Sequence, residues 1–308
     1  MKPAILVTGA DLAPPAISLL KDFELVYAGK TPDEESLVQL CRKYQPIAII
    51  VRYGRVNARI MDAAPGLKVI SKHGVGVDTI DVNASAERGI VVKAAVGANA
   101  AAVAEHTWAL ILACANSIPR LNRRMQEGHW DKATHKSLEL AGRTLGLVGL
   151  GAIGERVAGI GIAFGMEVIA HDPFLKSAPP RVKLSPLHDL VAAADVISLH
   201  CPLTRENANL FDREMLSRMR EGAILVNTAR GGLIDENALI DALRSGRLRA
   251  AGLDTFAAEP VTGTHALGSL ANVILTPHIG GVTQEAYTNM GVSAARNILT
   301  VLGDPPQH

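Results

Sequence analysis

The sequence predicts an α/β protein built from two doubly wound parallel sheets, with a cleft between the two domains. Three observations support this prediction. Short β-branched runs alternate with amphipathic stretches along the whole chain, which indicates parallel strands joined by crossover helices. A glycine-rich turn follows one of these runs near the middle of the chain. The length of 308 residues, of which 48% are hydrophobic, favours two globular domains.

The first series of elements is expected to form one domain over residues 1–98. Its strands are predicted where β-branched residues cluster, at Ala4–Val7, Glu24–Tyr27, Ile47–Val51, Lys68–Ser71 and Ile90–Val92. Amphipathic segments between the strands predict helices, for example over Asp33–Tyr44 and Asp81–Arg88. The segment Ala100–Asn116 contains no Gly or Pro, so we expect a long helix that leaves this series and begins the next.

A second alternating series is expected to form another domain over residues 99–284. Pro119 should open a short polar helix that ends near Gly128. Strands are predicted at Thr144–Val148, Glu167–Ala170, Val196–Leu199, Ala223–Asn227, Ala250–Leu253 and Val273–Thr276. Six strands alternating with helices are typical of a nucleotide-binding domain. The last helix, Gln284–Leu302, is expected to return to the first domain, so that residues 285–308 complete a discontinuous, flavodoxin-like unit.

The glycine-rich turn predicts a dinucleotide site. The strand Thr144–Val148 runs directly into Gly149-Leu150-Gly151-Ala152-Ile153-Gly154, in which the three glycines permit a tight turn, a close approach to a diphosphate and close packing of the next helix. Such a turn can also exist without a ligand. Asp172, just past the next strand, stands where an acid meets the ribose hydroxyls. The residues that follow it, Pro173 and Phe174, supply no Arg for a 2′-phosphate, which favours NAD over NADP.

Polar and turn-forming residues follow the other strands of this series. Ligands bind outside the carboxyl ends of parallel strands, so we expect a functional site among these residues. Those in question are Cys201-Pro202, Thr228-Ala229-Arg230, Asp254 and Pro277-His278.

Two of these side chains, Arg230 and His278, together with Glu259, predict acid/base chemistry on a carboxylic acid. Arg230 can clamp a substrate carboxylate with its planar fork, although a surface loop can also carry such an Arg. His278 is the candidate acid/base, because imidazole titrates near neutral pH; a structural histidine is the alternative. Glu259 can orient that imidazole, or be an ordinary loop carboxylate.

The first domain offers candidate substrate contacts. Glycines around Val75 and Gly76 free their backbone amides to meet a carboxylate, unless the segment is merely a tight turn. Arg52, Lys72 and His73 follow neighbouring strands and are expected to bind the substrate, with exposure to water as the alternative.

Composition excludes several other classes of protein. Lys plus Arg number 31 against 30 Asp plus Glu, and the absence of a long basic run argues against nucleic acid. No apolar run has the length of a membrane span, and the start of the chain turns polar too early for a signal peptide. The three cysteines are not closely spaced, so we expect no metal site and a reducing, cytoplasmic location.

Taken together, the motifs resemble the D-isomer-specific 2-hydroxyacid dehydrogenases, and most closely their branch of D-3-phosphoglycerate and hydroxypyruvate/glyoxylate enzymes. The resemblance rests on segments spread over nearly the whole chain: Gly74–Asp78, Asn99–Glu105, Gly149–Gly154, His200–Thr204, Asn227–Gly232, Gly252–Pro260 and Thr276–Gly281. It implies two Rossmann-like domains, NAD as cofactor, a small 2-hydroxy or 2-keto acid as substrate, and a homodimer. It also implies that Arg230, Glu259 and His278 are the catalytic residues.

Motif and resemblance together give a set of expected ligand contacts. The expected cofactor-binding residues are Val75, Gly149, Gly151, Ala152, Ile153, Gly154, Asp172, Cys201, Pro202, Thr228, Ala229, Arg230, Asp254, His278, Gly280 and Gly281. The expected substrate-binding residues are Arg52, Lys72, His73, Val75, Gly76, Arg230 and His278.

Two departures from the family pattern leave the substrate open. Lys72-His73 replaces the usual Arg and small residue, and Thr79 replaces a common Asn. A phosphite or formate dehydrogenase, or an NAD-sensing protein similar to transcriptional corepressors, therefore remain alternatives. The end of the chain at His308 leads us to expect no regulatory tail.

Overall fold

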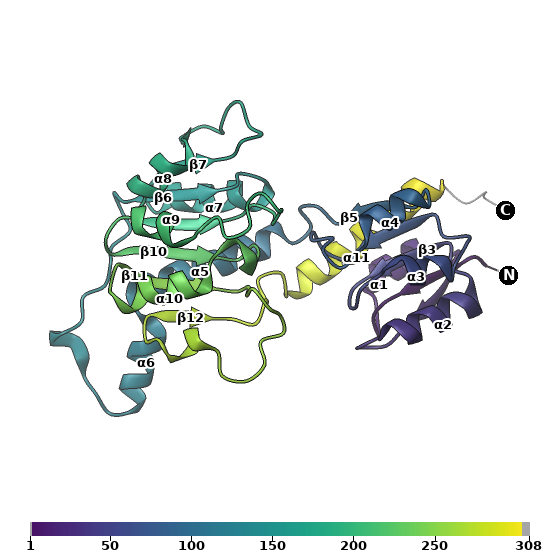
Figure 1. Cartoon of the computed structure of the whole chain (residues 1–308), viewed down its shortest axis with the longest axis horizontal. Helices are drawn as coiled ribbons and strands as arrows, with labels where there is room; N and C mark the ends of the chain where they lie inside the picture. Colours follow the sequence, from purple (N-terminus) through teal and green to yellow (C-terminus); the bar gives the residue numbers. More distant parts are fainter. Residues whose placement is uncertain (1, 304–308) are drawn as a thin grey trace. The chain divides into compact units, whose positions relative to one another are not determined.

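The chain forms two compact units, each organised around one parallel sheet (Figure 1). The computed structural model describes residues 2–303. Unit 1 comprises the residues up to Asn99 and those from Val282 onward, and unit 2 comprises Ala100–Gly281. The chain therefore leaves unit 1 once and returns to it once.

Unit 1 contains a sheet of five parallel strands in the order β2-β1-β3-β4-β5, which is the order of flavodoxin-like folds. Its strands are β1 (Ala4–Val7), β2 (Glu24–Tyr27), β3 (Ala48–Val51), β4 (Val69–Lys72) and β5 (Val91–Ala94). Its helices are α1 (Pro14–Leu19), α2 (Glu34–Tyr44), α3 (Ala58–Asp62), α4 (Val82–Glu87) and α11 (Gln284–Leu302).

Both faces of the unit 1 sheet are covered, because alternate strand residues point to opposite sides. Leu6 and Ile49 pack with α2, α3 and α4 on one face, while Ile5 and Ile50 pack with α1 and α11 on the other. Buried on both faces, β1 and β3 are continuous apolar runs rather than alternating ones.

Unit 2 contains a sheet of seven parallel strands in the order β12-β11-β10-β9-β6-β7-β8. Its strands are β6 (Thr144–Val148), β7 (Glu167–His171), β8 (Val182–Leu184), β9 (Val196–Leu199), β10 (Ala223–Asn227), β11 (Leu248–Leu253) and β12 (Val273–Leu275). The order reverses between β6 and β9, and in doubly wound sheets ligands bind at this switch point.

The helices of unit 2 cover its sheet in two layers. They are α5 (Ala100–Asn116), α6 (Ile118–Gln126), α7 (Ala152–Ala163), α8 (Leu187–Ala193), α9 (Arg213–Arg218) and α10 (Glu236–Arg244), with short 3₁₀ turns η1 (Asp131–Ala133), η2 (Gly231–Leu233) and η3 (Ala266–Ser269). Helices α5 and α7 pack on one face of the sheet, and α8, α9 and α10 pack on the other.

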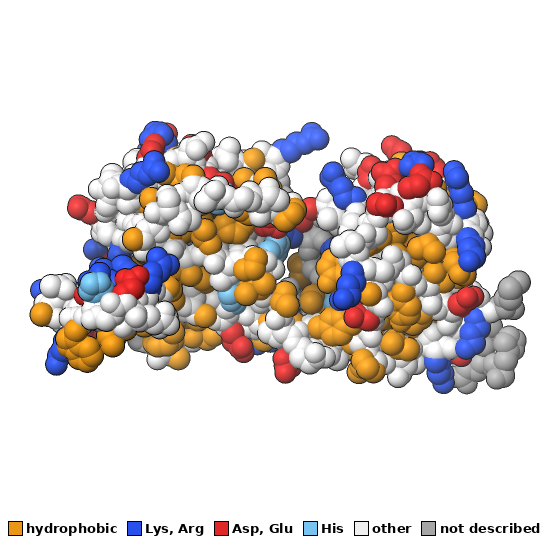
Figure 2. Space-filling view, turned by 90° about the horizontal axis from the view of Figure 1, so that it is seen from below, with side chains coloured by type: hydrophobic (Ala, Val, Ile, Leu, Met, Phe, Trp, Pro, Cys, Tyr) orange, Lys and Arg blue, Asp and Glu red, His pale blue; other side chains and the backbone are white. Residues whose placement is uncertain are grey.

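Helix α6 differs from the other helices of unit 2 because none of its residues is buried. It projects away from the sheet in Figure 1, and Ile118 and Met125 are 55% and 53% exposed. Trp130, just beyond the helix, is 75% exposed. Figure 2 shows basic and hydrophobic side chains side by side at the left edge of the view, where Figure 1 places α6.

The predicted α/β class with two parallel sheets is confirmed, but the count of six strands in the second sheet is wrong. The missing strand is β8, which pairs only with β7 at the edge of the sheet. It has three residues, with the polar Lys183 at its centre, and it follows Pro179-Pro180. A run of three residues with a single β-branched side chain, Val182, is too short to show the pattern from which the other strands were predicted.

Candidate active site

The glycine-rich turn joins β6 to α7 at the switch point of the unit 2 sheet. Gly149 has a φ of +96°, and a Cβ there would lie 2.8 Å from the amide nitrogen of Cys201. A Cβ on Gly154 would lie 2.3 Å from the carbonyl oxygen of Gly149. Only glycine fits at these two positions, because backbone occupies the space of a side chain. The loop after β6 therefore lies directly against the residues that follow β9.

Gly151 serves a different purpose from its two neighbours. It is the N-cap of the twelve-residue helix α7, and a Cβ on it would meet no atom within 4 Å. Its space is open, and it stands where the first amides of a helix attract anions. Ala152 beside it is exposed and Ile153 is half-buried. This geometry suits a diphosphate.

Asp172 lies just past β7 and contacts the same loop. Its carboxylate accepts a hydrogen bond from the amide of Leu150 at 3.0 Å and another from the amide of Phe174 at 3.0 Å. These bonds occupy part of the capacity of two carboxylate oxygens, each of which can accept more than one hydrogen bond. Asp172 thus supports the glycine-rich turn and retains acceptor capacity for a ligand's hydroxyls.

The residues after β9 form the other side of the switch point. Burial raises the pKa of the Cys201 thiol to about 11, so this side chain stays neutral. The carbonyl oxygen of Pro202, an exposed residue, accepts a hydrogen bond from the Asn207 side chain. His200 is half-buried with its Nδ1 atom enclosed, and desolvation lowers its pKa to about 3 while its Nε2 meets Ser198 Oγ at 2.9 Å. A neutral histidine therefore backs the glycine-rich turn.

Arg230 lies at the end of β10, on a short loop in which the neighbouring Gly231 has no room for a side chain. Buried Asn227 accepts a hydrogen bond from the Ala229 amide at 2.9 Å and donates one to the Arg230 carbonyl at 2.8 Å. A Cβ on Gly231 would lie 1.9 Å from the carbonyl carbon of Phe256. The loop that carries Arg230 therefore lies directly against the backbone that leads to Glu259.

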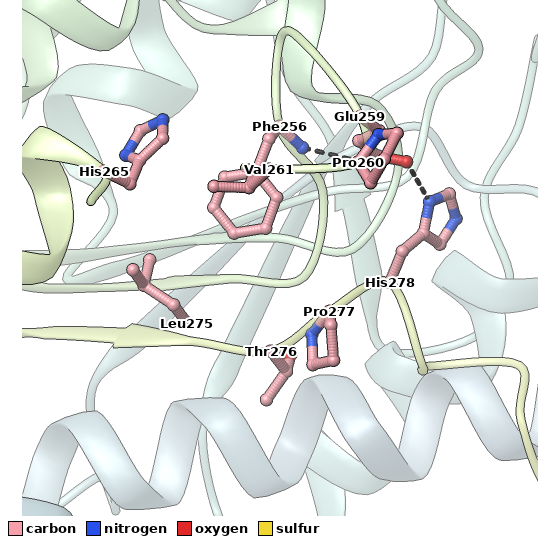
Figure 3. A pocket seen from close by; sticks show the side chains of 9 residues that line it. All are labelled: Phe256, Glu259, Pro260, Val261, His265, Leu275, Thr276, Pro277 and His278. Atoms are coloured by element: carbon pink, nitrogen blue, oxygen red, sulfur yellow. Dashed lines mark hydrogen bonds and ion pairs between the residues drawn. The ribbon is translucent and has the colours of Figure 1, made fainter. Parts of the chain in front are cut away.

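Glu259 and His278 are hydrogen-bonded to each other, on the loops after β11 and β12. His278 Nδ1 lies 2.7 Å from Glu259 Oε2, and the Phe256 amide donates to Glu259 Oε1 at 2.9 Å. Figure 3 shows the imidazole turned toward this carboxylate. The side chains are 47% and 34% exposed, so Nε2 of the imidazole can reach a ligand.

A cavity of about 580 Å³ adjoins this pair within unit 2 (Figure 3). Its walls are mostly apolar and include Phe256, Val261, Leu275 and Pro277. Apolar walls beside the histidine lower the local polarity, which strengthens the interaction between the imidazole and the carboxylate.

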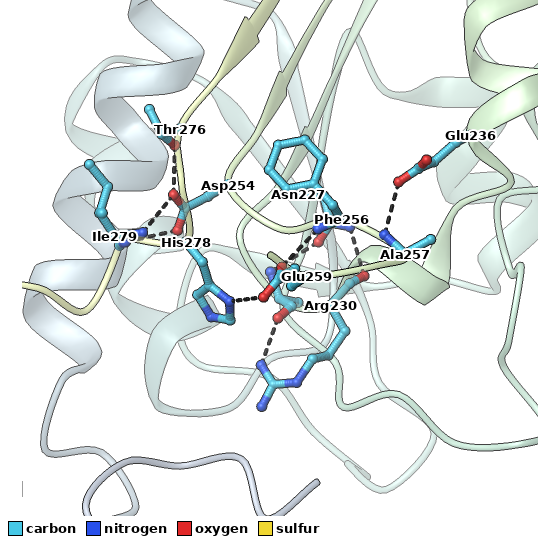
Figure 4. Close-up of polar contacts among 12 residues, drawn as sticks. Asn227, Arg230, Glu236, Asp254, Phe256, Ala257, Glu259, Thr276, His278 and Ile279 are labelled. Atoms are coloured by element: carbon cyan, nitrogen blue, oxygen red, sulfur yellow. Dashed lines mark hydrogen bonds and ion pairs between the residues drawn. The ribbon is translucent and has the colours of Figure 1, made fainter. Parts of the chain in front are cut away.

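Asp254 is buried and holds the turn that presents His278. The side chain is 1% exposed, and it accepts hydrogen bonds from the amides of Ile279 at 2.9 Å and Gly280 at 2.8 Å. Figure 4 shows these contacts on one side of His278, with Glu259 and Arg230 on the other. The hydrogen bonds described for Asp254 all come from groups of the protein. Contacts of Asp254, Gly280 and Gly281 with nicotinamide stay predictions.

In unit 1, a glycine-rich turn follows β4. Gly74 has a φ of +148°, and the Val75 side chain is 40% exposed. Within residues 2–303, the backbone amides of Val75 and Gly76 have no hydrogen-bond acceptor. Two adjacent amides without partners can bind a carboxylate, as the sequence predicts.

The three basic side chains expected to bind substrate have different environments. Arg52 forms an ion pair with Asp11, and its guanidinium lies 4.9 Å from the ring centre of Tyr287 on α11. Lys72 Nζ approaches Thr79 Oγ1 at 3.4 Å, so the two departures from the family pattern contact each other. His73 is buried against Tyr287, and desolvation together with the charge of Arg52 lowers its pKa to about 4.

Sequence reasoning missed several polar residues that support these loops. Within α5, His106 reaches Thr276 and Asp254, and Thr107 reaches Thr228. The available signal was the run of three polar residues, Glu105-His106-Thr107, inside a largely apolar helix that we interpreted only as the link between the two domains. Over residues 2–303, no cluster of potential metal ligands and no helix able to cross a membrane is present.

Comparison with protein families gives a match to unit 2. Residues 108–280 match the family described as "D-isomer specific 2-hydroxyacid dehydrogenase, NAD binding domain". The matched segment contains the glycine-rich turn, Arg230, Glu259 and His278.

Individual relatives extend the similarity to the whole chain. It is 40% identical to a hydroxypyruvate reductase from Thermotoga maritima, covering 92% of this chain and 94% of that one. It is 41% identical to a D-3-phosphoglycerate dehydrogenase from Mycobacterium tuberculosis over 97% of this chain, but it spans only 57% of the length of that relative. The structure of a D-lactate dehydrogenase from Aquifex aeolicus complexed with NAD and lactic acid matches with a TM-score of 0.85 at 30% identity, covering 97% and 96% of the two chains.

Proposed function

Because this chain belongs to the family of D-isomer-specific 2-hydroxyacid dehydrogenases, we propose that it transfers a hydride between NAD and C2 of a small D-2-hydroxy or 2-keto acid. The observation that carries the proposal is the 2.7 Å contact between Glu259 and His278. The loop of Glu259 packs in turn against the loop of Arg230. This is an acid/base pair beside a carboxylate clamp, which is what reduction of a keto acid requires.

The residues of unit 2 fit NAD. The open space at Gly151 and the N-terminus of α7 would receive the diphosphate, and Asp172 would accept hydrogen bonds from ribose hydroxyls. The two residues after Asp172, Pro173 and Phe174, supply no Arg to bind an additional phosphate, which supports NAD over NADP. When bound, the nicotinamide supplies or accepts the hydride.

The side chains of this chain perform the remaining steps. In the reductive direction, Arg230 binds the substrate carboxylate through paired hydrogen bonds and orients its C2 carbonyl. His278, protonated and paired with Glu259, donates its Nε2 proton to the carbonyl oxygen as C2 is reduced. In the oxidative direction, neutral His278 removes the hydroxyl proton. Glu259 keeps the imidazole oriented and stabilises its charged form.

Unit 1 is the proposed substrate-binding unit. The free amides of Val75 and Gly76 would meet the carboxylate, and the cations at the ends of β3 and β4 favour an anionic substrate. The names of the two curated relatives support 3-phosphoglycerate or hydroxypyruvate and glyoxylate as substrates. We also propose that the protein is cytoplasmic.

A spectrophotometric screen of NADH oxidation tests this function. The substrates are glyoxylate, hydroxypyruvate, 3-phosphohydroxypyruvate, pyruvate and bulkier 2-keto acids, with formate and phosphite tested in the direction of NAD reduction. We expect turnover of at least one 2-keto acid. Turnover of formate or phosphite alone would contradict the proposal, and NAD binding without turnover would favour a sensing role instead.

His278→Gln identifies the acid/base residue. Glutamine cannot donate a proton to the substrate, so kcat should fall by about 100-fold or more, because general acid catalysis contributes roughly 10²–10⁴-fold. The affinity for NADH, measured by fluorescence titration, should stay within about twofold because the glycine-rich turn is untouched. Near-normal kcat would exclude this role for His278.

A further inference from the structure

His278 has a backbone conformation that needs outside support. Its φ is +54°, in the left-handed region that residues with a side chain rarely adopt. Such conformations persist where the surrounding structure determines them, and they gather at functional sites. Here the support comes from Asp254, which binds the next two amides, those of Ile279 and Gly280. Whatever positions Asp254 therefore positions the imidazole.

The hydroxyl of Thr276 links Asp254 to α5. Thr276 Oγ1 lies 2.6 Å from Asp254 Oδ1, and a carboxylate only accepts hydrogen bonds, so the threonine proton belongs to this contact. His106 Nε2 lies 2.9 Å from the same Oγ1. Because the threonine proton is already used, the histidine must donate. His106 therefore carries a proton on Nε2, which also lies 3.4 Å from Asp254 Oδ1.

His106 is in addition packed against the turn itself. A Cβ on Gly280 would lie 3.0 Å from Asp254 Oδ2 and 3.5 Å from His106 Cδ2. The imidazole of His106 thus lies 3.4 Å from the carboxylate that holds the turn and beside the space that a side chain at Gly280 would occupy. Removing the ring would take away the donor to the Thr276 hydroxyl, which itself donates to the Asp254 carboxylate in a position that is 1% exposed.

The next residue of α5 makes the equivalent contact with the Arg230 loop. Buried Thr107 donates its proton to the carbonyl oxygen of Val103 at 2.7 Å. Its Oγ1 lies 2.9 Å from Thr228 Oγ1, so Thr228 must be the donor in that contact. Thr228 directly follows β10, and only Ala229 separates it from Arg230.

We propose that His106 and Thr107 are positioning residues, which fix the two catalytic loops to one turn of α5. His106 holds the turn of His278 through Thr276 and Asp254, and Thr107 holds the loop of Arg230 through Thr228. Neither residue contacts substrate in this scheme. The effect of His106 and Thr107 on catalysis rests on the proposed function. Their structural link to the two loops can be measured without substrate.

Hydrogen exchange followed by mass spectrometry tests the link in the full-length protein. His106→Leu removes the donor, while His106→Gln retains an amide donor at a similar reach. We expect His106→Leu to raise amide exchange in residues 276–281 by about tenfold, the effect of losing roughly one hydrogen bond. His106→Gln should remain within about threefold of the wild type.

Thr107→Val is the matched control on the same helix. It removes the hydroxyl at nearly constant volume, so exchange should rise in residues 227–231 and stay unchanged in residues 276–281. Thr107→Ser should restore the wild-type pattern. If His106→Leu does not fold by circular dichroism, Thr276→Val breaks the same link and should raise exchange in residues 276–281.

Steady-state kinetics add the catalytic readout. With the best substrate of the screen, His106→Leu should lower kcat by about tenfold or more, because displacement of a catalytic group is costly, while KM for NADH stays within about twofold. Unchanged exchange in residues 276–281 for His106→Leu, or an equal rise with Leu and Gln, would overturn the proposal. A wild-type protein that turns over no 2-keto acid would refute the proposed function alone, since exchange is read without substrate.

Discussion

His73 and His200 are held as neutral imidazoles, with pKa values lowered to about 4 and about 3 by desolvation. In the unfolded chain a histidine titrates near 6.5, so between these pH values unfolding takes up protons. The stability that these residues confer is therefore complete above about pH 6.5 and is lost as the pH falls below it. The unit 1 residue, His73, was expected to bind substrate, but its ring faces Tyr287 and Gly291 of α11.

The pH dependence can be measured with His73→Gln, which cannot take up a proton. At about pH 5 the wild type should lose up to about 2 kcal/mol of unfolding free energy through His73, since one pH unit corresponds to about 1.4 kcal/mol. The difference between urea midpoints at about pH 7 and about pH 5 should shrink in this variant. It should not shrink in His129→Gln, where the replaced side chain is exposed. Equal pH dependence in the wild type and both variants would refute this assignment.

At the scale of elements, the β6 strand, its turn and α7 form the proposed cofactor-binding segment. The three glycines of the motif differ physically: Gly149 and Gly154 are enclosed by backbone, whereas Gly151 faces open space. Substitutions at the enclosed positions must disturb the fold itself. A substitution at Gly151 separates binding from folding, because its φ of −81° suits alanine as well.

Gly151→Ala should leave stability nearly unchanged and weaken NADH binding by about tenfold or more, since the methyl group occupies the space proposed for the diphosphate. Gly159→Ala, within α7 and also facing open space, is the control. It should raise stability by about 0.5–1 kcal/mol, because alanine favours a helix, and leave binding unchanged. Urea unfolding and fluorescence titration give the two quantities. Wild-type affinity in Gly151→Ala would place the diphosphate elsewhere.

At the scale of the whole molecule, α6 is a helix with no buried residue. Its exposed apolar side chains, Ile118 and Met125, lie with Trp130 on a segment that projects from unit 2 (Figure 1). Exposed apolar surface of this kind marks contacts between proteins. We therefore propose that α6 and Trp130 take part in a homodimer, the assembly that the resemblance implies.

Light scattering after size-exclusion chromatography measures this assembly. The wild type should elute as a dimer, and Met125→Glu should shift it toward the monomer because a charge in an apolar contact must be desolvated. Arg123→Glu, on an exposed position of the same helix, should leave the dimer intact. A monomeric wild type, or a dimer that persists in Met125→Glu, would exclude α6 as the contact.

Local patterns in the sequence determined most of the fold and the candidate catalytic residues. Strands that are buried on both faces are continuous apolar runs, and parallel sheets place ligands at strand ends, so Arg230 and His278 could be selected from their positions alone. The edge strand β8 was missed because it is only three residues long and has the charged Lys183 at its centre. Its pairing with β7 is not encoded in its own composition.

Only the tertiary structure decided which groups contact which. The pairing of Glu259 with His278 joins two loops on neighbouring strands, and nothing in their spacing required the 2.7 Å contact. The links from α5 connect residues 170 and 121 positions apart, His106 with Thr276 and Thr107 with Thr228. Sequence periodicity reports which face of an element is buried, but the partners of a buried polar group depend on how distant elements pack.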